Sequence, residues 1–219
     1  MWPERAEDLV ALQSELGRAT PNAWRPREAP AILAACFFCD DGAGRAWAAA
    51  AMGRGHKLLD GVVVEGQVLA PYQPGLLALR EGRLLARAVE SLSGSPQALV
   101  VNATGRDHPR RCGLALHLGA ALDLPSIGVT DRPLVADGET PGPERGDRSP
   151  LVLAGETVGY RLRSRRGTHP IAVHAGWRTT PERAVEIAVV TLLRARTPQL
   201  LRAARRTARE ARAARPITR

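Results

Sequence analysis

Residues 31–39 read AILAACFFC and residues 97–103 read QALVVNA, two short and almost continuously apolar runs. The first run is followed by Asp40, Asp41 and Gly42, which favour a turn, so it predicts a strand that ends there. The second predicts a short buried strand. These two strands, taken with the elements between and after them, decide the fold class.

Working outward, the hydrophobic pattern predicts alternating strands and helices. Residues 46–52 and 60–68 are expected to extend the first strand into an antiparallel meander. Helices are expected over 5–18, 76–92, 112–122, 181–195 and 199–214, and further strands over 126–130, 157–163 and 170–174. Residues 135–150, rich in Gly, Pro and acids, predict a loop. The alternation predicts a single α/β domain over residues 1–219, with parallel pairing in its middle.

Composition excludes several classes of protein. No stretch approaches the roughly 20 apolar residues of a membrane-spanning helix, and the N-terminus has no apolar signal core, so we expect a cytoplasmic protein without membrane contact. Cys36, Cys39 and Cys112 are too few for a disulfide framework and lack a second ligand pair for zinc. We interpret them as core thiols.

The positive charge is unevenly distributed. The whole chain carries +9, residues 151–219 carry +11, and the first 150 residues therefore carry −2. Such asymmetry favours nucleic acid as the partner, although a solvated arginine-rich tail would look the same. The basic C-terminal helix at about 199–214 would present a stripe to phosphates or, alternatively, to an acidic protein partner; the stripe consists of Arg202, Arg205, Arg206, Arg209 and Arg212.

Two ordered motifs identify a family resemblance. Residues 71–81, PYQPGLLALRE, and residues 105–115, GRDHPRRCGLA, resemble conserved blocks of the endonuclease V family, whose members recognise deaminated purines. The resemblance implies a ribonuclease H-like fold, that is, a mixed central sheet with helices on both faces. It also implies a role in DNA repair and binding to inosine-containing DNA or RNA.

The same resemblance assigns the residues that grip the substrate. Tyr72, stiffened by the prolines on either side of it, would act as a wedge beside an extruded base. The other substrate-binding positions implied are Pro74, Gly75, Leu77, Gly105, Arg110, Gly113 and Leu114. Small residues among them allow the backbone to approach a base closely. Ala103 replaces a glycine of the family's pocket.

The positions implied for catalysis are mostly occupied by other residue types. Of these positions only Glu81 and His108 keep the residue types that the family uses; the others hold Cys36, Asn102, Asp131 and Trp177 in place of Asp, Asp, Lys and His. Mg²⁺ prefers hard anionic oxygens, and a thiol and an amide remove two carboxylates. We therefore expect no metal cofactor and a nucleic-acid-binding protein without Mg²⁺-dependent cleavage, a pseudoenzyme.

Two alternatives remain open at this point. One is an active nuclease whose Mg²⁺ or Mn²⁺ site is rebuilt from Glu81, Asp131 and Asp107. The other is a scaffold repurposed to bind a protein or a small molecule in an apolar cleft lined by Trp177 and Cys36. The choice of DNA or RNA, the preferred base, the oligomeric state and the biological pathway are not encoded in any recognisable pattern.

Overall fold

The computed structural model describes residues 2–26, 28–55 and 57–214; residues 1, 27, 56 and 215–219 of the expected single domain lie outside the described part. The helices are α1 (Ala6–Arg18), η1 (Ala78–Gly82), α2 (Arg83–Glu90), α3 (Leu114–Ala121), α4 (Pro181–Val190) and α5 (Gln199–Ala213). The strands are β1 (Ile32–Asp40), β2 (Arg45–Arg54), β3 (Lys57–Gln67), β4 (Ala98–Val101), β5 (Ser126–Thr130), β6 (Arg148–Leu153), β7 (Glu156–Leu162) and β8 (Ile171–Ala175).

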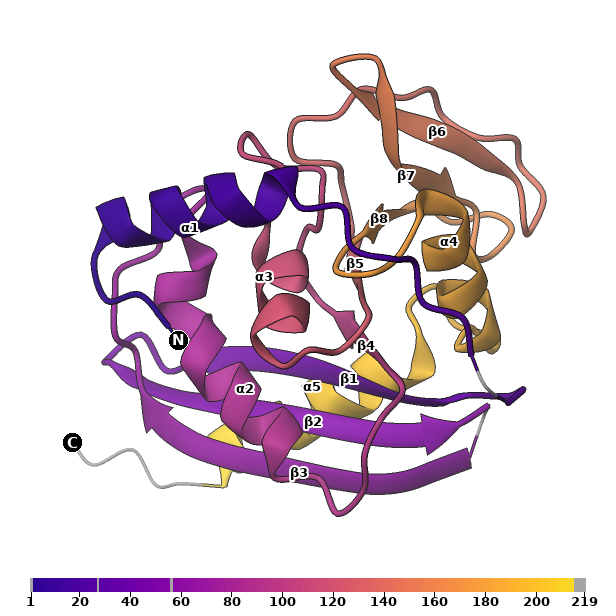
Figure 1. Ribbon diagram of the computed structural model, residues 1–219. Coiled ribbons are helices and arrows are strands. Elements are labelled where there is room, and N and C mark those ends of the chain that lie inside the picture. Colours follow the sequence, from indigo (N-terminus) through magenta and orange to yellow (C-terminus); the bar gives the residue numbers. More distant parts are fainter. Residues whose placement is uncertain (1, 27, 56, 215–219) are drawn as a thin grey trace.

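The strands form one mixed sheet in the order β3-β2-β1-β4-β5-β8-β7-β6 (Figure 1). β1, β4 and β5 run parallel, while β1–β3 form the predicted antiparallel meander. β8 returns antiparallel to β5 and leads into β7 and β6. The predicted parallel pairing is therefore confirmed in the middle of the chain.

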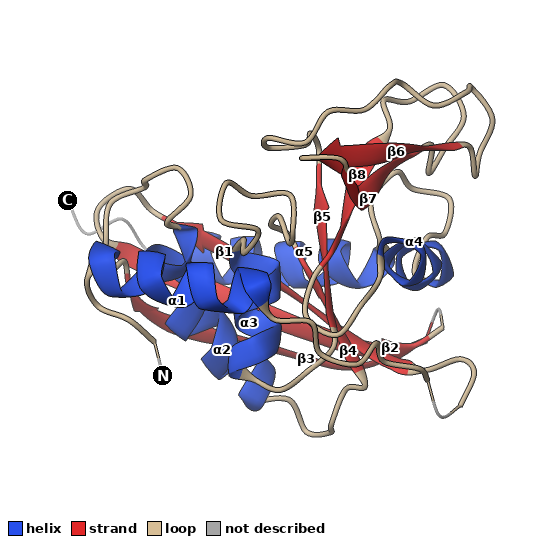
Figure 2. Cartoon of the chain, turned by 45° about the horizontal axis from the view of Figure 1, so that its top comes forward, coloured by secondary structure: helices blue, strands red, loops and turns tan. Residues whose placement is uncertain are grey.

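Helices cover both faces of this sheet (Figure 2). Because successive side chains of a strand point to opposite faces, Ala34 and Cys36 of β1 pack toward α2 and α3, whereas Phe37 packs against α5. α4 covers β5, β7 and β8 on the same side as α5. The mixed sheet between two helical layers confirms the predicted fold class.

Two elements differ from the sequence prediction. The helix expected at 76–92 begins as the π-helical turn η1 and becomes regular only in α2. β6 begins in the segment predicted as a loop, where Arg148, Ser149 and Pro150 pair with β7, and it continues into the buried Leu151. Among the described helices, none has the length and apolar character needed to cross a membrane.

The carboxyl ends of the parallel strands lie side by side. Cys36 pairs with Val101, the last residue of β4, and Val101 in turn pairs with Gly128 of β5. In open α/β sheets, ligands bind outside this edge. The register therefore indicates that a ligand site lies among the loops after β1, β4 and β5.

Candidate nucleic-acid site

The loop with two prolines and Tyr72 is held through one carbonyl. Gly75 O accepts hydrogen bonds from Gln13 Nε2 at 3.1 Å, His108 Nε2 at 3.1 Å and Arg110 Nη2 at 2.8 Å. Arg110 Nε also donates to Gln13 Oε1 at 2.7 Å. A loop next to a pocket is thereby attached both to α1 and to the 105–111 segment.

His108 uses both ring nitrogens in this anchor. Nε2 donates to Gly75 O, and Nδ1 accepts from the backbone N–H of Arg110 at 3.2 Å. Burial, and then the nearby Arg110, lowers its pKa to about 4, so the ring is neutral at pH 7. The hydrogen-bond pattern therefore assigns the Nε2–H tautomer.

Gly75 itself has a backbone conformation that favours glycine. Its φ is +76°, and a Cβ at this position would lie 3.1 Å from Arg110 Nη2 and 3.4 Å from His108 Nε2. An L-residue would be strained and would push against both anchors. The glycine thus lets the carbonyl be gripped from three sides.

A small pocket of about 190 Å³ lies behind this loop. Its walls come from the loop, the end of β4, the start of α3 and the end of β5; they include Tyr72, Pro74, Gly75, Leu77, Asn102, Ala103, Thr104, His108, Gly113, Leu114, Thr130 and Leu134. Tyr72 stands at the rim with 69 % of its surface exposed. The sequence-predicted substrate residues are therefore largely gathered around one cavity.

Two of the predicted substrate residues, Arg110 and Gly105, do not line the pocket. Arg110 anchors Gly75, as described above, and does not line the pocket. Gly105 lies against β8, where a Cβ would be 2.0 Å from Ala175 O, and its own carbonyl accepts from the N–H of Gly113 at 2.8 Å. Both residues position the wall from outside.

The retained acid, Glu81, lies on the π-helical turn η1 and is mostly buried. Burial, partly offset by Arg80 and reinforced by Asp40, raises its pKa to about 8. Cys36 is fully buried beside it, and burial, then the charge of Glu81, raises the pKa of the thiol. Burial thus disfavours the charged form of both groups.

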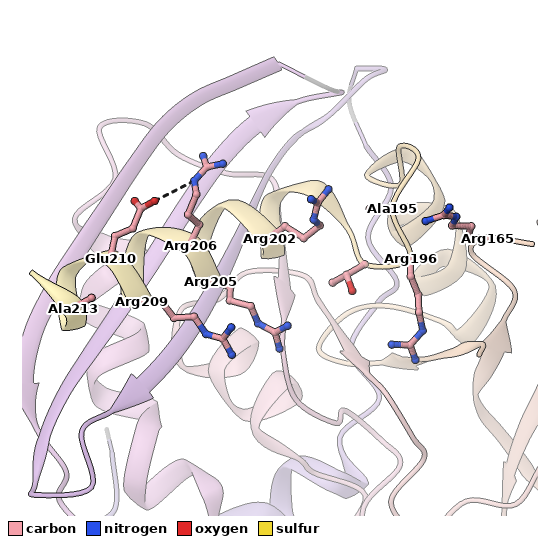
Figure 3. Close-up of a pocket in the computed structure, with 10 residues that line it drawn as sticks. Arg165, Ala195, Arg196, Arg202, Arg205, Arg206, Arg209, Glu210 and Ala213 are labelled. Carbon is pink, nitrogen blue, oxygen red and sulfur yellow. Dashed lines mark ion pairs between the residues drawn. The ribbon is translucent and has the colours of Figure 1, made fainter. Parts of the chain in front are cut away.

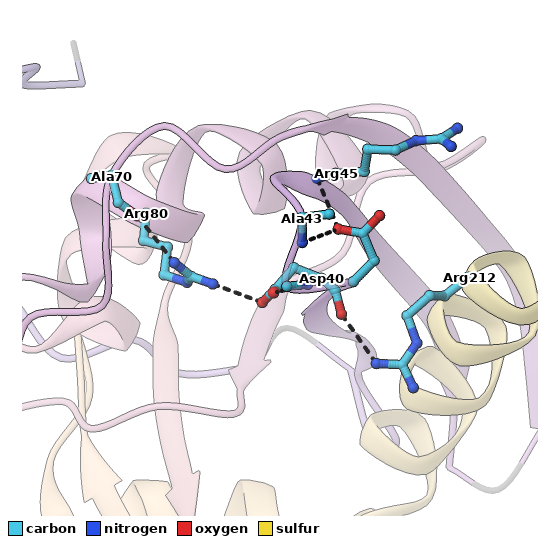
Figure 4. A network of polar contacts seen from close by, with 8 residues as sticks. Asp40, Ala43, Arg45, Ala70, Arg80 and Arg212 are labelled. Atoms are coloured by element: carbon cyan, nitrogen blue, oxygen red, sulfur yellow. Dashed lines mark hydrogen bonds and ion pairs between the residues drawn. The ribbon is translucent and has the colours of Figure 1, made fainter. Parts of the chain in front are cut away.

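A polar network connects this turn with the C-terminal helix (Figure 4). Arg80 Nη2 pairs with Asp40 Oδ2 at 2.8 Å, and Arg80 Nη1 donates to Ala70 O at 3.1 Å. On the other side, Arg212 Nη1 of α5 donates to Asp40 O at 3.1 Å. The end of β1 is thus tied both to the start of the Tyr72 loop and to α5.

Asp107 and Asp131, the acids of the rebuilt metal site, have other partners. Asp107 is fully buried and accepts from the backbone N–H groups of 134, 135 and 136 at 2.7, 2.9 and 2.7 Å. Asp131 is exposed and paired with Arg196. The structure therefore does not bring these acids together with Glu81 as ligands.

Among the described residues, the side chains alone do not supply a complete set of metal ligands. Within residues 2–26, 28–55 and 57–214, no group of at least three His, Cys, Asp or Glu side chains could hold a metal ion. Asn102 lines the pocket, whereas Trp177 lies beside Ser126 at the beginning of β5, where the backbone N–H of Trp177 donates to Ser126 Oγ at 2.9 Å. The replaced positions do not form one cluster.

One buried relay was not anticipated from the sequence. His174 of β8 lies with Nδ1 3.4 Å from Asp107 Oδ2 and Nε2 2.8 Å from the Thr130 hydroxyl. Burial lowers the pKa of His174 to about 4, with Asp107 opposing the shift. Thr130 lines the pocket, so the relay supports one of its walls. Only tertiary contacts unite these three residues, which come from separate segments.

A family model described as Endonuclease V matches residues 28–206. The chain belongs to the endonuclease V family. An Endonuclease V of Xanthomonas campestris is 36 % identical over 210 residues, which cover 94 % of this chain and 89 % of the relative. An Endonuclease V of Nocardia farcinica is 39 % identical over 215 residues, covering 95 % and 93 %. The crystal structure of Endonuclease V from Streptomyces avermitilis superposes with a TM-score of 0.88 at 31 % identity, over 97 % of this chain and 95 % of that one.

These relatives confirm the ribonuclease H-like fold and correct the expected function. The prediction of a binding protein without cleavage, and with it the repurposed scaffold, is wrong because chains named for a nuclease are 36–39 % identical to this one over nearly its whole length. The comparisons therefore do not support the expected pseudoenzyme, because the relatives are named as nucleases.

Proposed function

We propose that this protein is a divalent-metal-dependent endonuclease that cleaves nucleic acid containing inosine. The observation that carries the proposal is the similarity to proteins named Endonuclease V along 94 % of the chain. The pocket behind the Tyr72 loop supports it, because an enzyme that acts beside an altered base needs a cavity for that base once it leaves the stack.

Recognition is assigned to the loop and the pocket walls. Tyr72 would fill the space left by the extruded base, and Leu77, Gly113 and Leu114 would contact that base. A protein of the same fold, Endonuclease V of Ciona intestinalis, was crystallised with a 24mer DNA containing an inosine, at 18 % identity to this chain. For this chain, inosine is our inference from family and pocket together.

Of the groups assigned to cleavage by the resemblance, Glu81 and His108 are proposed to retain a role. His108 fixes the loop carbonyl as a neutral ring, which places the rim of the pocket. Glu81, on η1, is the acid that the resemblance retains, and its carboxyl is the group to test. The side chains alone do not identify the ligands of the divalent ion.

The test is a cleavage assay on matched oligonucleotides. DNA and RNA strands with a single inosine, and controls with adenosine at that position, are incubated with Mg²⁺, Mn²⁺, Co²⁺ or Zn²⁺ and with a chelator. We expect one inosine-dependent product that requires a divalent ion. No product with any of these ions would contradict the proposal.

A matched pair of variants separates chemistry from folding. Glu81→Gln should lower cleavage at least about 100-fold, as expected for loss of a group at the reacting centre. Glu90→Gln, an exposed position at the end of α2, should cleave like the wild type. Equal activity of both variants would remove Glu81 from the site while leaving the family assignment standing.

A further inference from the structure

The outer side of α5 carries an arginine-lined groove that the proposed reaction does not use (Figure 3). The groove has a volume of about 600 Å³ and runs from the turn before α5 along most of the helix. Its cationic side chains are Arg165, Arg196, Arg202, Arg205, Arg206 and Arg209, against a single acid, Glu210. Arg205 and Arg209 extend from the same side of the helix.

Most of this charge is not neutralised within the described residues. Arg196 pairs with Asp131, and Arg206 lies 3.9 Å from Glu210. Arg165, Arg202, Arg205 and Arg209 have no carboxylate partner among residues 2–26, 28–55 and 57–214. Like charges spaced three or four residues apart destabilise a helix, so this arrangement costs stability unless an anion binds.

The placement along the helix points the same way. Arg202 stands near the beginning of α5, which has no acid in its first turn. Cations at a helix N-terminus oppose the helix dipole, whereas anions are stabilised there. A helix shaped only for packing on the sheet would not gain from this pattern.

Two guanidinium groups are also held in place. Arg205 and Arg209 lie over the ring of Phe37 at 5.0 and 6.0 Å from its centroid. This contact orients planar, fork-shaped donors that suit phosphate oxygens. These two side chains therefore lose less conformational entropy when a ligand binds.

The groove is connected with the candidate site. Phe37 follows Cys36 on β1, and Arg212 of α5 holds the carbonyl of Asp40 at the end of that strand, opposite Arg80. α5 therefore lies on the reverse face of the strand whose end borders the site (Figure 2). A nucleic-acid strand bound at the pocket could continue around this end of the sheet onto α5.

We propose that the α5 groove binds the sugar–phosphate backbone of the nucleic acid that flanks the inosine. This surface would add affinity without reading sequence, because its contacts are charges on phosphates. The inference rests on the proposed function for the location of the inosine, but it concerns a separate surface.

The test compares two double variants that each remove two positive charges. The groove variant combines Arg202→Gln with Arg209→Gln, at exposed positions in the groove. The control variant combines Arg25→Gln with Arg87→Gln, at exposed positions outside it. Glutamine keeps a helix propensity close to that of arginine. Binding is measured by fluorescence anisotropy across a salt series, with an inosine oligonucleotide of about 8 nucleotides and one several times longer.

For the long probe, the groove variant should bind about tenfold more weakly at low salt, and its salt slope should fall by about 2. For the short probe, both variants should match the wild type, and so should the single-turnover cleavage of that probe. Thermal unfolding checks the fold. If the double variant melts early, each single variant is measured and should show about half of the loss.

If the groove variant binds the long probe as tightly as the wild-type protein does, the inference is overturned. Competition by polyglutamate that is lost in the groove variant, with nucleic-acid binding unchanged, would overturn it in favour of an acidic protein partner. Failure of the proposed function would give a different result. The wild-type protein itself would then neither cleave the inosine probe nor bind it more tightly than the adenosine probe.

Discussion

Asp107 is the single residue whose role changes most once its contacts are known. A buried carboxylate that accepts three backbone N–H groups is not free to bind a metal ion, and it holds the segment 134–136 beside the pocket. Its neighbour His174 links it to Thr130 in the pocket wall. The acid is therefore a positioning residue.

We predict that Asp107→Ala lowers the free energy of unfolding by about 2–4 kcal/mol, because three buried donors lose their acceptor. Asp131→Ala, at an exposed ion pair, should cost less than about 1 kcal/mol. Urea denaturation measures both. Similar losses in the two variants would show that the 134–136 segment does not depend on Asp107.

The buried histidines predict acid lability. Burial lowers the pKa of His174 and of His117 to about 4, from ordinary values near 6.5. Between these values the unfolded chain binds protons that the folded chain does not, so stability falls as the pH drops from about 6.5 to 4.

Thermal unfolding at pH 7.5 and pH 5 checks this sign. His174→Gln should flatten the decline, whereas His169→Gln, at an exposed position, should leave it unchanged. A wild-type protein that is more stable at pH 5 than at pH 7.5 would contradict the prediction.

At the level of elements, the Tyr72 loop is built to keep an aromatic side chain at the rim. The loop is anchored through the carbonyl of Gly75, whereas the side chain of Tyr72 at its tip is largely exposed. Function and stability should therefore separate in this loop.

We predict that Tyr72→Ala leaves the melting temperature within about 1–2 °C of the wild type. Affinity for inosine in a duplex should fall by about 1–3 kcal/mol, the value of one stacked base. Inosine in a single strand should be affected less, because no neighbouring pair has to be opened. An equal loss on both substrates would argue against a wedge.

At the level of the whole molecule, α5 has two sides with different tasks. Leu200, Leu201, Ala204 and Ala208 cover β1–β3, while the arginines face outward. Removing the helix would expose the apolar face of three strands.

We therefore predict that a chain truncated after Pro198 loses cooperative unfolding and binds a hydrophobic dye, seen by calorimetry and dye fluorescence. The point variants of the groove should fold normally. A truncated chain that melts as sharply as the full one would show that α5 is dispensable for the core.

Short-range patterns were enough to predict most elements and the fold class. Short apolar runs and helical spacing located β1–β5 and the main helices, and the PYQPGLLALRE motif placed Tyr72, Gly75 and Leu77 around one pocket. β6 was missed because it begins with Arg148, Ser149 and Pro150, which are not typical of a strand, and because its pairing with β7 forms only in the folded chain. The π-helical start at η1 was also missed; at this turn Trp2, distant in sequence, packs on Gly82.

Local sequence alone determined most of the strands and helices and the residues of the Tyr72 loop, since these depend on spacing and on turn chemistry within a few residues. Tertiary structure alone decided that Asp107 binds backbone, that Asp131 pairs with Arg196 and that four arginines of the groove lack a carboxylate partner among the described residues. Such roles depend on which distant charges and donors are brought within about 3–4 Å, a distance that spacing along a chain does not encode.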